Sequence, residues 1–182
     1  MKILQASIVV SMFTVAICFG QASHASIPVN EYRCRDGALV CFSDTTDDLA
    51  CLHVGWIKIG GSYSLVEKKY STPSQELHLR TGDTVEVFQF TNPDSNVTYL
   101  AITVKSGMVS AIEIQGEHAV DSLSFSSINL GDLPGHLIEI LGKPSKSLPV
   151  QETGGTLWSY VPFPFSFEIT NGKVSSIKIW RP

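Results

Sequence analysis

Two stretches of this sequence match each other without a gap, and they decide the fold prediction. Residues 57–74 read IKIGGSYSLVEKKYSTPS, and residues 128–145 read INLGDLPGHLIEILGKPS, at an offset of 71. Each begins with an apolar-x-apolar-Gly pattern, continues through a stretch suited to a short helix and ends at Pro-Ser. Similarity at a fixed offset is typical of a duplicated structural unit. The sequence therefore predicts two copies of one small unit.

The second stretch contains the usual signals for the start and end of a helix. Asp132 can cap the helix, and Pro134 suits its first turn. Gly142 permits a left-handed exit, and Pro144 prevents continuation. We expect four residues to form the buried stripe: Leu137, Ile138, Ile140 and Leu141. In the first stretch the expected cap is Ser62 or Ser64, and the expected buried residues are Leu65, Val66 and Tyr70.

Strand-like segments follow both helices and extend the match. Residues 99–114 align with 164–179 at an offset of 65, and residues 82–88 align with 154–160 at an offset of 72. These segments alternate apolar and polar residues and are rich in β-branched and aromatic side chains. The expected fold class is α+β, with two tandem helix-plus-antiparallel-meander repeats that form a joined, concave antiparallel sheet. The repeats would span 56–116 and 117–182.

The last hairpin permits a prediction of register. If the apolar residues of both strands face the helix, Phe165 should lie opposite Ile177. That pairing predicts a three-residue loop over 170–172, with Gly172 left-handed at a bulge. Gly107 should do the same in the first repeat. Because successive side chains of a strand point to opposite faces, the same pairing places Glu168, Lys178 and Trp180 on the face of the sheet away from the helix.

The N-terminus has the pattern of a secretory signal peptide over residues 1–25. A basic start at Met1-Lys2 precedes an apolar run over 3–20, and Ser23-His24-Ala25 offers small residues for cleavage. A membrane anchor is the alternative. Lipid modification of Cys18 is a third possibility, although Ile17 stands where a small residue is usual. Removal of 25 from 182 residues leaves 157, with 12 basic and 17 acidic residues and a net charge of −5. This acidity argues against nucleic-acid binding.

Three cysteines, Cys34, Cys41 and Cys51, lie in an N-terminal segment over 26–55. An exported chain meets an oxidising compartment, so we expect one disulfide and one remaining thiol. Three pairings are possible, and a Cys34–Cys41 bond across the turn at Asp36-Gly37 is the first choice. The cysteine and histidine spacings do not match a metal site, and no catalytic motif or cofactor site is present in the sequence.

Several of these residues together resemble the SmpA/OmlA domain of outer-membrane assembly lipoproteins. The resemblance rests on residues 131–144, on Trp158-x-Tyr160 and on residues 171–177, and it is clearer in the second repeat than in the first. The tandem form of this domain is similar to the β-lactamase inhibitory protein-like fold. The resemblance implies a protein that binds other proteins and has no shared catalytic residues.

Aromatic and charged residues on the strands are the candidate binding residues. Trp and Tyr are enriched in interfaces because they combine large apolar area with a polar tip. We expect the partner-binding residues to be Trp158, Tyr160, Trp180, Lys178, Glu168, Phe88, Glu86 and Tyr99. The leading hypothesis is a periplasmic or secreted, non-enzymatic protein-binding module of the inhibitor or immunity type. The alternatives are an envelope-assembly factor at the outer membrane, and a small hydrolase or ligand-binding protein.

Overall fold

The computed structural model describes residues 31–35, 38–42, 52–92, 94 and 96–181. The predicted signal peptide, Cys18 and Cys51 lie outside this range, and so do the side chains of Cys34 and Cys41. At the N-terminal end of the described chain, β1 (Glu31–Arg35) pairs with β2 (Ala38–Phe42). The backbone register places Cys34 opposite Leu39 and Cys41 opposite Tyr32. The disulfide stays a prediction.

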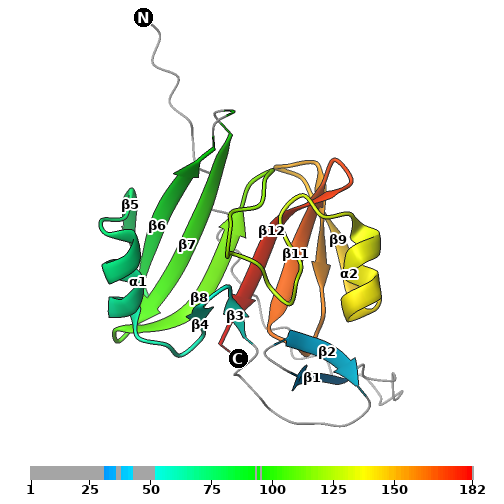
Figure 1. Ribbon diagram of the computed structural model, residues 1–182, viewed down its shortest axis with the longest axis horizontal. Helices are drawn as coiled ribbons and strands as arrows, with labels where there is room; N and C mark the ends of the chain where they lie inside the picture. The colour runs from blue at the N-terminus through cyan, green and yellow to red at the C-terminus, as the bar shows by residue number, and fades with distance from the viewer. Residues whose placement is uncertain (1–30, 36–37, 43–51, 93, 95, 182) are drawn as a thin grey trace, which may run out of the picture.

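Eight of the strands form one antiparallel sheet, in the order β5-β6-β7-β8-β12-β11-β10-β9. The two central strands, β8 and β12, join the halves of the sheet, so strands far apart in sequence lie side by side (Figure 1). The first four strands are β5 (Gln75–His78), β6 (Thr84–Thr91), β7 (Val97–Lys105) and β8 (Met108–Gln115). The other four are β9 (Lys146–Val150), β10 (Gly155–Ser159), β11 (Phe165–Thr170) and β12 (Lys173–Trp180).

The predicted α+β class with two tandem helix-plus-meander repeats is wrong. The structure is mostly β, with 47% strand and 12% helix, and it is organised around the eight-stranded sheet. Four strands follow each helix, where the sequence predicted three, because residues 75–78 and 146–150 also pair into the sheet. The helices are short because each has strong stop signals only two turns after it begins.

The two helices, α1 (Tyr63–Tyr70) and α2 (Pro134–Leu141), begin and end close to the predicted residues. Ser62 is the N-cap residue of α1, although its hydroxyl contacts Ser64 Oγ at 2.8 Å and makes no capping hydrogen bond. The predicted cap of α2 is off by one residue, because Leu133 is the N-cap residue. The Asp132 carboxylate instead accepts a hydrogen bond from the Asn129 amide at 2.8 Å. Gly142 has the expected left-handed φ of 75°.

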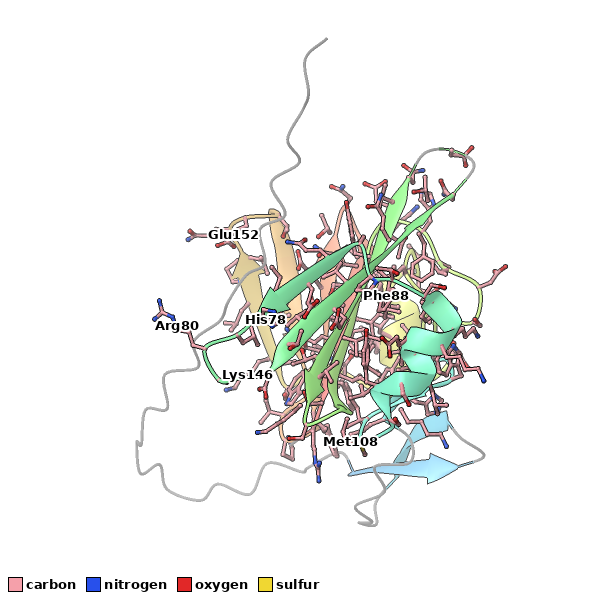
Figure 2. The ribbon with its side chains drawn as sticks, turned by 90° about the vertical axis from the view of Figure 1, so that its left-hand side faces the viewer. His78, Arg80, Phe88, Met108, Lys146 and Glu152 are labelled. Carbon is pink, nitrogen blue, oxygen red and sulfur yellow. The ribbon has the colours of Figure 1, made fainter. Side chains whose placement is uncertain are left out.

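Both helices lie on the same face of the sheet (Figure 2). Between them pack the short β3 (His53–Val54), β4 (Ile57–Lys58) and the segment 123–130. Val66 of α1 and Leu137 and Leu141 of α2 are buried against the sheet, as predicted. Leu65 is 60% exposed and Ile138 is 39% exposed, so these two predicted core positions are wrong. Leu65 is adjacent in sequence to the buried Val66, and Ile138 to the buried Leu137, and successive residues of a helix point about 100° apart.

The predicted three-residue hairpin loops are wrong as well. Asn171-Gly172 forms a two-residue turn, and both residues have positive φ, as a type I′ turn requires. A bulge at Glu168/Ile169 then shifts the register by one residue. Beyond the bulge the apolar residues of the two strands face the same side of the sheet, and Phe165 pairs with Ile179. The β7–β8 hairpin repeats this solution with a Ser106-Gly107 turn and a bulge at Thr103/Val104.

Neither helix of the described chain is long and apolar enough to cross a membrane.

Candidate functional site

The face of the sheet opposite the helices, called the open face here, is covered by no helix of the described chain (Figure 2). Its centre consists of side chains from β7, β8, β12 and β11, which the register places in cross-strand rows. One row contains Tyr99, Gln115, Ser176 and Glu168. The next contains Ala101, Glu113, Lys178 and Ser166, and a third contains Thr103, Ala111 and Trp180.

A charged pair lies where the halves of the sheet join. Lys178 Nζ is 2.9 Å from Glu113 Oε2, and Ser176 Oγ donates a hydrogen bond to Glu113 Oε1 at 3.3 Å. Both charged side chains keep solvent access, with 45% of the Lys178 side chain and 35% of the Glu113 side chain exposed. Exposed pairs contribute little to stability. The pair therefore contributes little to holding the sheet together and leaves two charged groups accessible on the open face.

Glu168 is held by hydroxyl groups at the β11 end of the first row. Thr153 and Thr170 donate hydrogen bonds to its Oε1 atom. Ser175 donates to the backbone carbonyl of the same residue at 3.2 Å. These contacts fix the position of a negatively charged group on the open face.

Two aromatic residues flank the charged pair. Tyr99 lies on β7 in the first row, and Trp180 lies on β12 in the third. The floor between them is made of small side chains, among them Ala101, Ala111 and Ser176. The centre of the open face thus combines two half-buried aromatic rings with a partly exposed ion pair between them.

The other four predicted binding residues lie on the helix side of the sheet. Phe88 pairs with Leu100 in the core and lies next to α1 (Figure 2). Trp158 pairs with Phe167 and is partly buried against the core. Tyr160 is only 2% exposed, and its hydroxyl donates a hydrogen bond to the Gly142 carbonyl at 3.3 Å. Burial raises the pKa of Tyr160 to about 12. These residues pack the interior and do not contribute to the open face.

Glu86 is a special case, because it is a carboxylate on the buried face. It is 8% exposed, and its Oε2 atom is buried without a hydrogen-bond partner. Burial, followed by the charges of Glu76 and Glu67, raises the pKa of Glu86. Burial also raises the pKa of Tyr63 to about 12, with Glu86 as the next contributor. Of these three acids only Glu86 is buried, whereas Glu67 and Glu76 are exposed.

Gln115 and Ser176 belong to the open face and were missed by the sequence prediction. Their row begins at Tyr99 and ends at Glu168, both of which were predicted. The pairing of β8 with β12 brings them together. The alternation of polar and apolar residues in each strand marks Gln115 and Ser176 as outward-facing, but only the strand order shows that they are neighbours.

A cavity of about 210 Å³ lies at the tip of the β6–β7 hairpin. Its lining is mixed, with Asn92, Asn96 and His118 beside Phe90 and Val120. The volume is below the usual range of ligand pockets. In the described part of the chain, no three His, Cys, Asp or Glu residues are grouped so that they could hold a metal ion.

Comparisons with known proteins give a distant likeness in structure alone. No family model matches the chain, and no curated protein matches it. A cysteine-rich secretory protein from Staphylococcus aureus is similar at a TM-score of 0.46 and 15% identity, over 67% of this chain and 42% of that one. A DUF4309 family protein from Bacillus subtilis is similar at a TM-score of 0.47 and 15% identity, over 70% of this chain and 83% of that one. Neither is a SmpA/OmlA domain, and that resemblance stays a prediction from the motifs.

Proposed function

We propose that this chain is an exported, non-enzymatic protein that binds another protein on the open face of its sheet. One observation carries the proposal. Tyr99, Glu168, Lys178 and Trp180, chosen from the sequence as binding residues, lie in adjacent rows on the one sheet face that no described helix covers. The remaining four predicted residues lie on the opposite face, so the surface is smaller and more central than the sequence suggested.

The composition of the open face supports a protein partner. Tyr and Trp anchors account for a large share of the binding energy in protein interfaces. They usually lie near the centre of the interface, where water is excluded, and polar residues form the rim around them. Export is proposed from the basic, apolar and small-residue pattern of residues 1–25. The motif resemblance to the β-lactamase inhibitory protein-like fold suggests that the partner is an enzyme inhibited by the bound chain, whereas the resemblance to assembly lipoproteins suggests an envelope-assembly factor instead.

Site-directed crosslinking tests this proposal. The photoreactive residue p-benzoylphenylalanine is introduced at position 180 or 99 of the full chain, and at position 65 as the control. Leu65 is 60% exposed on α1 and lies on the other side of the sheet. We expect irradiation in the cell envelope to give one crosslinked protein from positions 180 and 99 and none from position 65. Equal yields from all three positions, or no adduct at positions 180 and 99, would overturn the proposal.

Once the partner is known, a double variant measures the contribution of the two aromatic residues. Trp180→Ala with Tyr99→Ala should weaken binding by about two orders of magnitude, because each anchor contributes at least about 1–2 kcal/mol. Leu65→Ala is the matched control for loss of an exposed apolar side chain. If the captured protein is an enzyme, its activity with and without the bound chain separates an inhibitor from an assembly factor.

A further inference from the structure

The eight-stranded sheet has two edges, β5 and β9, and they differ in how well they resist pairing with another strand. Natural edge strands are commonly protected by lysine or proline. β9 has both, at Lys146 and Pro149. β5 has neither, since it reads Gln-Glu-Leu-His from Gln75 to His78. The β5 edge is therefore the less protected one.

Two residues of β5 direct their backbone groups away from the sheet. The Leu79 amide donates to the Asp83 carbonyl at 2.8 Å, so 79 and 83 are a hydrogen-bonded pair that continues the register of β5 and β6. Just before the strand, the Ser74 amide donates to the Val87 carbonyl, although the register places Val87 opposite Gln75. In an antiparallel pair, hydrogen-bonded and non-hydrogen-bonded positions alternate. The odd residues 75, 77 and 79 consequently point toward β6, while Glu76 and His78 point outward. In the described chain β5 is an edge strand, so no strand lies beside the outward N–H and C=O groups of these two residues.

Two carboxylates face each other across β5 and β6 on the helix side of this edge. Glu76 lies directly opposite Glu86, and like charges in that position are destabilising. Glu86 Oε2 is buried without a hydrogen-bond partner, while half of the Glu76 side chain is exposed. His78 Nε2 lies 3.4 Å from Glu76 Oε1, a contact that is ionic only when the imidazole is protonated. A cation beside Glu76 would relieve this repulsion and remain accessible from solvent.

A strand added to β5 places such a cation correctly. The residue opposite Glu76 in a new strand shares its face of the sheet, so its side chain lies beside the carboxylate. The row Ile112, Ile102, Glu86 and Glu76 would then continue into a basic residue. A divalent metal does not fit, because the described acids are not grouped as metal ligands.

We propose that the outer edge of β5 binds an extended basic polypeptide segment, which adds a ninth strand to the sheet and places a lysine or arginine beside Glu76. Main-chain hydrogen bonds to Glu76 and His78 supply the affinity, and the carboxylates select the basic side chains. On the opposite face of the added strand, apolar residues would contact Leu77, which lies on the open face with Val85. The recognised pattern is an alternation of basic and apolar residues.

Titration of the full chain with a short peptide tests this proposal. The probe is acetyl-Thr-Lys-Val-Lys-Val-Lys-Thr-amide, followed by amide NMR shifts. We expect saturable shifts at Glu76 and His78, and about three- to tenfold weaker binding by Glu76→Gln and by Glu86→Gln. Glu139→Gln, which removes an exposed charge from α2, is the matched control and should bind as the wild type does.

Two modified peptides identify the mode of binding. N-methylation of the lysine amides should abolish binding, because these amides face β5, whereas N-methylation of the valine amides should not. A peptide with glutamate in place of every lysine should fail to bind. The proposal is overturned if the glutamate peptide binds equally well, if methylation of lysine amides has no effect, or if the shifts map to β9 or the open face. Absence of saturable binding at millimolar peptide overturns it too.

Discussion

The two halves of the sheet have the same order of elements but differ in how each helix is attached. The first half consists of α1 and β5–β8, and the second of α2 and β9–β12. α2 buries Leu137 and Leu141 completely, whereas Val66 is the buried residue of α1. Because burial of an aliphatic side chain contributes about 1.5–3 kcal/mol, α2 is the more firmly attached helix.

The interiors of the two halves differ as well. In the second half, Phe125, Tyr160, Phe165 and Phe167 form a cluster with ring centroids 5.2 to 6.1 Å apart, and the Tyr160 hydroxyl is hydrogen-bonded. In the first half, Tyr70 contacts Trp56, Phe88 and Phe90.

Two buried polar atoms separate the halves further. The first half contains Trp56 Nε1 and Glu86 Oε2, both buried without hydrogen-bond partners in the described chain. Unsatisfied buried groups carry a free-energy cost. We therefore expect the first half, which includes the β5 edge, to open more readily than the second.

The largest expected effect comes from removing a ring in the second half. Phe167→Ala should lower the free energy of unfolding by about 3–5 kcal/mol, because it leaves a large cavity among packed rings. Val66→Ala should lower it by only about 1–2 kcal/mol, because two buried methyl groups are lost. Urea denaturation measures both changes.

Hydrogen exchange adds a local readout to this pair of variants. We expect Val66→Ala to speed exchange in α1 while leaving α2 unchanged. If Val66→Ala instead costs as much as Phe167→Ala, or speeds exchange in both helices, the two helices are attached equally firmly.

The next effect concerns Glu86, whose raised pKa makes the first half sensitive to pH. A carboxyl group with a raised folded-state pKa stabilises the fold below its ordinary value of 4.5. That contribution is lost as pH rises through the raised pKa. Glu86→Gln should therefore be more stable than the wild type at neutral pH, by on the order of 1 kcal/mol.

The difference between Glu86→Gln and the wild type should shrink as the pH falls toward 4.5, because Glu86 then becomes neutral. Urea denaturation across this range measures it, with Glu139→Gln as the control for loss of an exposed carboxylate. A Glu86→Gln variant that is less stable than the wild type at neutral pH would mean that the carboxylate has a stabilising partner.

The sequence indicated the helices well and the sheet less well. Pro134 and Gly142 are local signals, and they mark the start and end of α2 to within a residue. The extra strands β5 and β9 have weak local signals, because edge strands pair on one side only and need not alternate clearly. The pairing of β8 with β12 depends on contacts far apart in sequence, which periodicity cannot show.

Four of the eight predicted binding residues lie on the open face and four do not, again because strand pairing cannot be seen in the sequence. The alternation of side chains along β12 correctly places Lys178 and Trp180 on one face of the sheet and Ile177 and Ile179 on the other. For β10, the sequence offered no partner strand from which to judge the face of Trp158. The pairing of Trp158 with Phe167 decides it, and places Trp158 on the helix side of the sheet, partly buried against the core. Glu86 was missed as a buried group because a charged residue on a strand ordinarily indicates an exposed position.

The smallest expected effect lies in the two hairpin turns, which share one geometry but differ in one residue. Ser106 and Asn171 both have positive φ, of 50° and 54°. Asn tolerates this region better than Ser, because its short amide side chain can hydrogen-bond locally. Ser106→Asn should therefore stabilise the first half by about 0.5 kcal/mol, and Asn171→Ser should destabilise the second by a similar amount. Denaturation of the two variants side by side gives both values. Changes of the same sign would show that local turn preference is not what sets these two hairpins apart.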